Sequence, residues 1–328
     1  MAERKRILSG MRPSGRLHLG NFVGALENWV RLQGEYQNFH LIADWHVLTT
    51  APDKTDTIYQ DTIDMVIDWI GAGLDPVKSP MFIQSQIKEH AELHLLFSMI
   101  TSVSRLERNP TVKEQVKELQ LEETMSYGHL GYPVLQAADI LIYKAHLVPV
   151  GEDQVPHVEL TREIARRFNN LYGKVFPEPE VKLTPFSRLP GSDGRKMSKS
   201  YGNIILLSED ADTIRNKLRK AVTDPEKIRK GDPGHPEICL VYNYHQRFNS
   251  GETDEIAADC RSGALGCVDC KNRLADKLVD TLEPFRANRA HYQNRIDEIV
   301  DILEEGNKRA REEARSTMND VYKVMKIG

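Results

Sequence analysis

The chain has four cysteines, and all of them lie in one stretch of its C-terminal third. They are Cys239, Cys260, Cys267 and Cys270, in the pattern Cys-x20-Cys-x6-Cys-x2-Cys. Four thiolates bind zinc, and a Cys-x-x-Cys pair is common in structural zinc sites. A [4Fe–4S] cluster also takes four cysteines, so the spacing leaves both metals open. Unrelated buried thiols are the remaining interpretation, but Gly263, Gly266 and Asp269 between them are unlike an apolar core.

A second candidate segment runs from Pro13 to Asn21, between a short apolar run and a stretch with helical spacing. The free backbone N–H groups at the start of a helix suit a phosphate. Gly20 permits close approach of a base or ribose, and His18 and Asn21 are short donors suited to phosphate and ribose oxygens. By itself the segment is equally well explained as a loop and helix cap with an exposed histidine.

A third segment, residues 194–202, carries two lysines and two serines between glycines, in the order Gly-Arg-Lys-Met-Ser-Lys-Ser. Lysine is a compact charge that can neutralise a pyrophosphate as it leaves. The segment therefore indicates a mobile anion-binding loop. The alternative is a solvated basic turn, which is the common fate of such runs.

The second and third segments, in this order and about 180 residues apart, resemble the paired signature of the class I aminoacyl-tRNA synthetases. The blocks at 132–141, 148–154 and 157–165 resemble bacterial-type tryptophanyl-tRNA synthetases, and the resemblance covers nearly the whole chain. It implies that the chain activates L-tryptophan with ATP, accompanied by Mg²⁺, and transfers it to the 3′-terminal adenosine of a tryptophan-specific tRNA. It also implies a homodimer.

The resemblance assigns Asp139 to the tryptophan side chain. An indole has one N–H donor and no acceptor, so its site needs apolar walls and one acceptor, which Asp139 can supply. In the family the equivalent aspartate receives the indole N–H. The alternative is a helix aspartate paired with a nearby base. The other residues implied for tryptophan are Gly10, His46, Tyr132, Gln136, Val148 and Gln154.

The resemblance also implies residues for ATP and for catalysis. Those for ATP are Arg12, Pro13, Ser14, Gly20, Asn21, Gly151, Glu152, Asp153, Lys196, Met197, Ser198, Lys199 and Ser200. Those expected to take part in catalysis are His18, Asn21, Lys196, Ser198 and Lys199. Arg12 stands where many relatives carry glutamine, so its guanidinium is available for a phosphate or a carboxylate.

A subset of these synthetases carries the pattern Cys-x22-Cys-x6-Cys-x2-Cys and binds a [4Fe–4S] cluster in the anticodon-binding region. This chain matches the last two spacings and is two residues shorter in the first. The resemblance therefore favours a [4Fe–4S] cluster, with Zn²⁺ as the alternative. A basic run near the cysteines faces either the tRNA backbone or solvent. Its members are Arg215, Lys217, Arg219, Lys220, Lys227, Arg229 and Lys230.

Alternating strand and helix patterns predict the elements that position these residues. Short apolar runs predict strands at 6–9, 39–43, 80–83 and 148–150. The alternation indicates an α/β fold with a Rossmann-like parallel sheet, which binds ligands at the carboxyl ends of its strands. We expect a catalytic domain at 1–206, with an insertion at about 104–130, and an all-helical anticodon-binding domain at 207–328 with the cysteine cluster at 239–270.

Composition limits the remaining possibilities. The 328 residues are 40% hydrophobic and 28% charged, as in an ordinary globular enzyme, and a net charge of −4 requires any nucleic-acid partner to use a local basic face. No signal peptide or membrane span is evident, so we expect a soluble cytoplasmic protein without a membrane partner. The rival functions are a tyrosyl-tRNA synthetase, a small-molecule nucleotidylyltransferase and a non-catalytic iron–sulfur RNA-binding module.

Overall fold

The computed structural model describes residues 4–121, 123–183 and 189–327. The chain forms two compact units. The sheet unit comprises Met1–Gly15, Ala25–Ser187 and Tyr292–Gly328, and the helical unit comprises Arg16–Gly24 and Arg188–His291. This division differs from a single break after residue 206, because the chain returns to the sheet unit at its C-terminal end.

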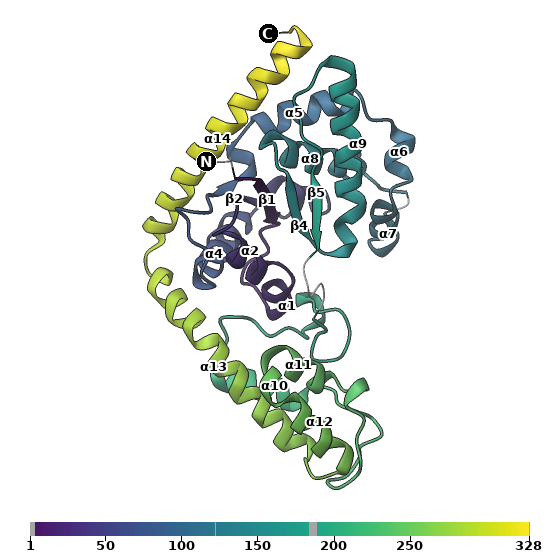
Figure 1. Ribbon diagram of the computed structural model, residues 1–328, viewed down its shortest axis with the longest axis vertical. Coiled ribbons are helices and arrows are strands. Elements are labelled where there is room, and N and C mark those ends of the chain that lie inside the picture. The colour runs from purple at the N-terminus through teal and green to yellow at the C-terminus, as the bar shows by residue number, and fades with distance from the viewer. Residues whose placement is uncertain (1–3, 122, 184–188, 328) are drawn as a thin grey trace. The chain divides into compact units, whose positions relative to one another are not determined.

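The sheet unit contains five parallel strands in the order β3-β2-β1-β4-β5 (Figure 1). The strands are β1 (Arg6–Met11), β2 (Gln37–Ile42), β3 (Met81–Ile83), β4 (Leu147–Val150) and β5 (Glu180–Leu183). The predicted α/β class with a parallel sheet is confirmed. β5 was not predicted, because its sequence Glu-Val-Lys-Leu is half-exposed at the edge of the sheet and lacks an apolar run.

Helices cover both faces of this sheet (Figure 1). They are α2 (Glu27–Leu32), α3 (Asp44–Leu48), α4 (Ile58–Gly71), α5 (Glu89–Ser98), α6 (Val103–Glu107), α7 (Pro110–Glu118), α8 (Tyr127–Ile142), α9 (Val155–Tyr172) and α14 (Ile296–Met325). Side chains alternate along β2: Phe39 and Leu41 pack in the core with α5, α8 and α9, whereas His40 faces Trp29 and Trp69 of α2 and α4. The expected insertion contains α6 and α7.

α14 packs directly on the edge of the sheet. Gly306 lies against β3, and a Cβ atom placed on it would come within 1.9 Å of the backbone oxygen of Met81. Only glycine permits this approach of helix to strand. The apolar face of α14, including Ala310, Ala314 and Met318, joins the same core as α5 and α8.

The helical unit confirms the predicted helical C-terminal region. Its helices are α1 (Leu19–Asn21), α10 (Ala211–Lys220), α11 (Leu240–Phe248), α12 (Thr253–Ser262) and α13 (Cys267–Gln293), the last of which runs two residues past the unit. Asp210 caps α10 by accepting from the backbone N–H of Thr213 at 2.8 Å. Across the described ranges, none of the helices combines the length and the hydropathy that a membrane crossing needs.

Candidate functional site

Polar side chains gather at the carboxyl edge of the sheet, because the carboxyl ends of parallel strands all lie at the same edge. Arg12 follows β1, and Gln84 follows β3 at the start of a 3-10 turn, Gln84–Gln86. His46 lies in α3, which begins two residues after β2. Gly151 follows β4 and precedes a second 3-10 turn, Glu152–Gln154. The local folding of the sequence therefore places His46, expected at tryptophan, and Arg12 and Gly151, expected at ATP, at the same edge.

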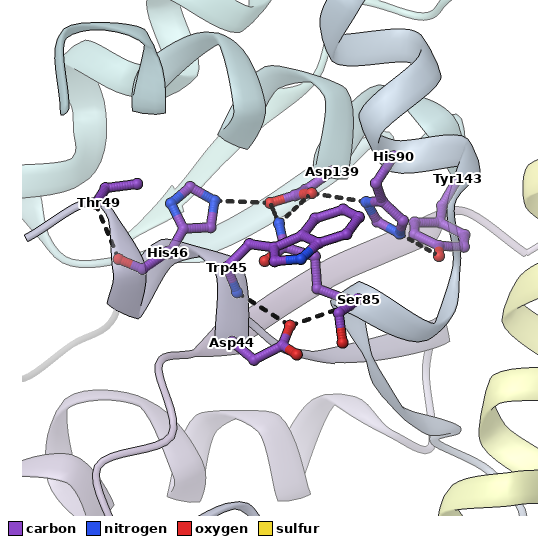
Figure 2. Close-up of polar contacts among 9 residues, drawn as sticks. Asp44, Trp45, His46, Thr49, Ser85, His90, Asp139 and Tyr143 are labelled. Carbon is purple, nitrogen blue, oxygen red and sulfur yellow. Dashed lines mark hydrogen bonds and ion pairs between the residues drawn. The ribbon is translucent and has the colours of Figure 1, made fainter. Parts of the chain in front are cut away.

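Asp139 of α8 is the centre of a buried hydrogen-bond network (Figure 2). His46 Nε2 lies 2.9 Å from Oδ2, and His90 Nδ1 lies 2.6 Å from Oδ1. The amide nitrogen of Gln84 donates to both carboxylate oxygens, at 2.8 and 2.9 Å. The hydroxyl of Tyr143 lies 2.8 Å from His90 Nε2.

This network fixes the charge of Asp139 and the tautomer of His90. Burial raises the pKa of the Asp139 carboxyl, but the hydrogen bonds from His46 and His90 outweigh it and hold that pKa well below its ordinary value. Burial also raises the pKa of Tyr143, so its O–H donates to His90 Nε2, and His90 Nδ1–H donates to Asp139. The site thus holds an ionised acceptor that is buried among hydrogen-bond donors.

Arg12 belongs to a second set of polar side chains in the sheet unit, which also includes Thr50 and Tyr132. Within the described ranges its only hydrogen-bond partner is the hydroxyl of Thr50, at 3.4 Å, and no carboxylate lies within ion-pair distance of it. Burial lowers the pKa of Arg12, and Tyr132 opposes this electrostatically. A half-buried guanidinium without a carboxylate is costly unless a bound anion completes it.

Tyr132 joins Arg12 to two further histidines. The hydroxyl of Tyr132 lies 2.9 Å from His157 Nε2, and burial lowers the pKa of His157 to about 4, which keeps this ring neutral. The ring of His129 lies 5.6 Å from that of Tyr132. Both nitrogens of His129 are buried without a partner in hydrogen-bond geometry, although the backbone of Thr49 approaches closely enough to raise its pKa against the effect of burial.

The remaining residues expected at tryptophan differ in their surroundings. Gly10 packs so closely on β2 that a Cβ atom would lie 2.4 Å from the backbone oxygen of Leu41. Gln136 is half-buried on α8, one turn before Asp139. Val148 is buried in the hydrophobic core with the helices of that face. Gln154 donates to Asp153 at 3.0 Å, next to Glu152 on the 3-10 turn.

In the helical unit, the two signature segments lie together. The backbone of Leu19 donates to Ile205 at 2.9 Å, and Leu207 donates to Leu17 at 2.9 Å. The backbone N–H of Gly20 lies 3.4 Å from Sδ of Met197. Residues far apart in the sequence are therefore brought into contact by backbone pairing, with Met197 buried between them.

His18 and Asn21 cap each other at the start of α1. Asn21 N–H donates to His18 Nδ1 at 3.3 Å, and His18 N–H donates to Asn21 Oδ1 at 3.1 Å. Burial, and then the charge of Lys199, lowers the pKa of His18 to about 4. His18 is therefore neutral near pH 7, and Nε2 is left to carry the ring proton because Nδ1 accepts a hydrogen bond.

The segment 194–202 is held in shape by Asn203. Its side chain accepts from Ser198 N–H at 2.8 Å and donates to the oxygen of Lys196 at 3.0 Å. Gly194 and Gly202 have positive φ, which shapes the turns on either side. Lys196, Lys199 and Ser200 are exposed, so the loop presents cationic and hydroxyl groups to solvent while its backbone is fixed.

The four cysteines line one small cavity of the helical unit, together with Thr223, Asp224, Lys227, Val241 and Leu265. Cys239 precedes α11, Cys260 lies in α12, and Cys267 and Cys270 lie in the first turn of α13. His245 approaches Cys270, with Nε2 at 3.5 Å from Sγ. The predicted clustering of the cysteines is therefore found in the fold.

The chemistry of this cavity fits a thiolate-bound metal group. Burial, and then the other three cysteines, raises the pKa of Cys270 to about 12, because thiolates repel one another. A metal cation removes that repulsion, and thiolate is the form that binds it. Among the described residues, no three His, Cys, Asp or Glu side chains are placed to hold a single metal ion.

Sequence reasoning missed Gln84, His90 and Tyr143. Gln84 follows a predicted strand, so its position at the carboxyl edge was a signal that went unused. His90 and Tyr143 lie on helices and gave no local signal, because their role comes from contact with Asp139.

The fold and the site define a class. The family model of class I tRNA synthetases (W and Y) matches residues 1–283, and the chain belongs to this family. It is 52% identical to the tryptophan–tRNA ligase of Thermotoga maritima, over 98% of this chain and 99% of that protein. It is 46% identical to the tryptophan–tRNA ligase of Aquifex aeolicus, over 98% of this chain and all of that protein.

A solved structure agrees with these relatives. The tryptophanyl-tRNA synthetase of Campylobacter jejuni, complexed with ADP and tryptophan, superposes with a TM-score of 0.87 at 31% identity. The match covers 98% of this chain and 100% of that one. The resemblance to class I synthetases inferred from the sequence is confirmed.

Proposed function

We propose that this chain is a tryptophan–tRNA ligase. The observation that carries the choice of amino acid is the ionised, buried Asp139, held by His46, Gln84 and His90. An indole N–H only donates, and a carboxylate only accepts, so the two are complementary. The tryptophan–tRNA ligases at 52% and 46% identity support the same substrate.

The reaction has two steps. The carboxylate of tryptophan attacks the α-phosphate of MgATP, giving tryptophanyl-AMP and pyrophosphate. The terminal adenosine of tRNA then attacks the mixed anhydride through a ribose hydroxyl, and AMP leaves. No covalent enzyme intermediate is required, so the protein contributes positioning and charge stabilisation.

The helical unit supplies the phosphate contacts in this proposal. Lys196 and Lys199 neutralise the departing pyrophosphate, and Ser198 adds a hydroxyl. The neutral His18 donates a hydrogen bond from Nε2 to a phosphate oxygen, with its ring fixed by Asn21. The contacts expected of Pro13, Ser14, Gly20, Gly151, Glu152 and Asp153 with ATP stay predictions.

Arg12 completes the substrate site by binding an anion. Its guanidinium has no carboxylate partner among the described residues, and it lies near Tyr132 in the sheet unit that holds Asp139. Asp139 of the same unit is assigned to the indole of tryptophan, and the carboxylate is the anionic group of that substrate. We therefore assign Arg12 to the tryptophan carboxylate rather than to a phosphate.

The four cysteines bind a [4Fe–4S] cluster in this proposal, with Zn²⁺ as the alternative. Support comes from the single cavity that all four line and from the repulsion that raises the pKa of Cys270. Such a cluster would be held by the four thiolates and would fix the ends of α11, α12 and α13 relative to one another.

The helical unit faces tRNA through part of its basic run. Arg215 pairs with Asp276 at 3.1 Å, and Lys217 is paired with Glu209. Arg219, Lys220 and Arg229 are exposed, so these three are assigned to the phosphate backbone.

A homodimer, which the family resemblance implies, has exposed apolar side chains of the sheet unit as its support. Leu95, Met99 and Val103 recur every four residues and are 56%, 69% and 56% exposed. Exposed apolar side chains are of the kind that an interface buries, and light scattering of the purified chain measures the assembly directly.

Pyrophosphate exchange into ATP tests the function, with tryptophan and tyrosine compared in parallel. Exchange that depends on tryptophan alone supports the proposal. Exchange with tyrosine keeps the reaction but overturns the assignment of Asp139. Absence of exchange from folded, metal-loaded protein leaves the non-catalytic RNA-binding alternative.

A further inference from the structure

Lys227 was expected among the basic residues that face tRNA or solvent, and the structure places it elsewhere. It is 7% exposed and lines the cavity formed by the four cysteines. Its neighbour in sequence Lys230 has a side chain that is 80% exposed. A buried lysine is uncommon unless its charge is paired, so the partner of Lys227 needs to be identified.

No carboxylate pairs with this ammonium group among the described residues. Nζ of Lys227 donates to the backbone oxygen of Cys260 at 3.2 Å, which is its one hydrogen bond there. Asp224 lines the same cavity, but its Oδ2 accepts from the backbone and ring of His235 at 2.7 and 3.0 Å, and its Oδ1 accepts from Glu226 N–H at 2.8 Å. Asp224 keeps its charge but turns its oxygens to His235 and Glu226, and the cysteines add negative charge beside Lys227 once a metal group holds them as thiolates.

The surrounding backbone holds the lysine in this place. Gly234 donates to the oxygen of Cys260 at 2.9 Å. A Cβ atom on Gly234 would lie 2.7 Å from Sγ of Cys260 and 2.9 Å from Cδ of Lys227. The loop thus packs the lysine stem and the thiol side by side, and a larger residue at 234 would separate them.

We propose that Lys227 is the charge-compensating residue of the four-cysteine metal site. Four thiolates bring more negative charge than a doubly charged metal group neutralises, and an excess remains buried. The ammonium of Lys227, within the same cavity, offsets part of that excess. It therefore slows loss of the metal group, and for an iron–sulfur cluster it favours the reduced state, which carries one more negative charge.

This inference rests on the metal group proposed above, and the experiment separates the two. Wild-type protein is purified without oxygen beside Lys227→Met, Lys227→Arg and Lys230→Met. Iron, sulfide and zinc are measured per chain, together with the rate of metal release to a chelator and, for iron–sulfur protein, the reduction potential. Lys227→Met keeps the length of the apolar stem, and Lys227→Arg keeps the charge.

We expect Lys227→Met to release metal at least about tenfold faster than wild type, and its cluster to be about tenfold harder to reduce, which is 59 mV for a one-electron couple. Lys227→Arg is expected to lie close to wild type. Lys230→Met is expected to match wild type, because water screens its exposed charge. If the wild type binds zinc, there is no reduction potential to compare, and the rate of metal release alone tests the inference.

Three outcomes overturn the inference. The first is a Lys227→Met protein that equals wild type in metal content, release rate and potential. The second is equal loss of metal from Lys227→Met and Lys227→Arg with helicity preserved, which assigns Lys227 to packing alone. The third is a folded wild type that holds neither iron nor zinc and whose four cysteines all react as free thiols; that result refutes the metal group itself, and it is read from the wild type without any variant.

Discussion

The backbone N–H of Gly20 lies 3.4 Å from Sδ of Met197, and a Cβ atom on Gly20 would meet that sulfur at 3.4 Å and the ring of His18 at 3.0 Å. This contact joins the two signature segments of the chain. The lysines on either side of the buried Met197 are exposed, so one residue anchors the loop while its neighbours lie at the surface. The buried methionine thus fixes the position of a loop whose lysines lie at the surface.

Lys199→Ala is expected to slow adenylate formation by about 100-fold or more, because the departing pyrophosphate loses a cation that acts in the transition state. Binding of tryptophan, measured by calorimetry without ATP, is expected to change less than about twofold. Lys277→Ala, an exposed lysine of α13, is the matched control. Equal losses in rate and in tryptophan affinity would refute this role for Lys199.

Asp139→Asn is expected to raise the KM for tryptophan by about 10- to 100-fold, because the amide places a donor where His46, Gln84 and His90 also donate. The same clash destabilises the sheet unit. Asp320→Asn, which removes a surface ion pair with Lys144, is the control for loss of a carboxylate. Pyrophosphate exchange over a range of tryptophan concentrations gives the measurement, and an unchanged KM would contradict the assignment.

Arg12→Gln is expected to weaken tryptophan binding by about 10-fold or more, because a charged hydrogen bond to the substrate carboxylate is lost. Tryptamine, which lacks the carboxylate, serves as the internal comparison and is expected to bind both proteins equally. A change in the KM for ATP with unchanged tryptophan affinity would move Arg12 to a phosphate.

Much of the fold could be predicted from the sequence because its signals are local. Apolar runs marked β1, β2, β3 and β4, and helical spacing marked the C-terminal region. β5 lacked such a run, since an edge strand buries only part of its side chains. The return of α14 to the sheet unit depends on the fit of Gly306 against Met81, which no periodicity reports.

The site was predictable to the extent that motifs carry it. Asp139 and the signature lysines lie in segments that resemble family motifs, and the spacing of the cysteines indicates a shared site. The donors around Asp139 come from separate elements and meet only in three dimensions. For Lys227 a local pattern was misleading. The basic run predicted an exposed side chain, whereas the fold buries this lysine beside the thiols.

Gly306→Ala is expected to destabilise the sheet unit by about 2–3 kcal/mol, because the new methyl group meets the backbone oxygen of Met81 and α14 must shift. Gly34→Ala, with open space around the added atom, is expected to stay within about 1 kcal/mol of wild type. All three tryptophans, Trp29, Trp45 and Trp69, lie in the sheet unit, so urea unfolding followed by intrinsic fluorescence reports on it. Equal stabilities of the two variants would refute the close packing.

His40 gives a test of stability against pH. Its ring is fully buried beside Trp29 and Trp69, with both nitrogens unpartnered, and burial lowers the pKa of His40 to about 3. Between this value and the ordinary pKa near 6.5, the unfolded chain binds a proton that the folded chain does not. The contribution of His40 to the free energy of unfolding is therefore fully present above pH 6.5 and is lost as the pH falls toward 3.

His40→Phe removes that proton while keeping a ring packed beside the two tryptophans. From pH 7 to pH 5, the free energy of unfolding is expected to fall by about 2 kcal/mol more for wild type than for the variant. This is the effect of one proton over about 1.5 pH units, at about 1.36 kcal/mol per pH unit. At pH 7 the variant should equal or exceed wild type, because two unpartnered nitrogens are gone. His146→Phe, an exposed histidine of the same unit, should keep the wild-type pH dependence. Identical pH profiles for wild type and His40→Phe would contradict the lowered pKa, because they would mean that the buried ring takes up its proton at the same pH as in the unfolded chain.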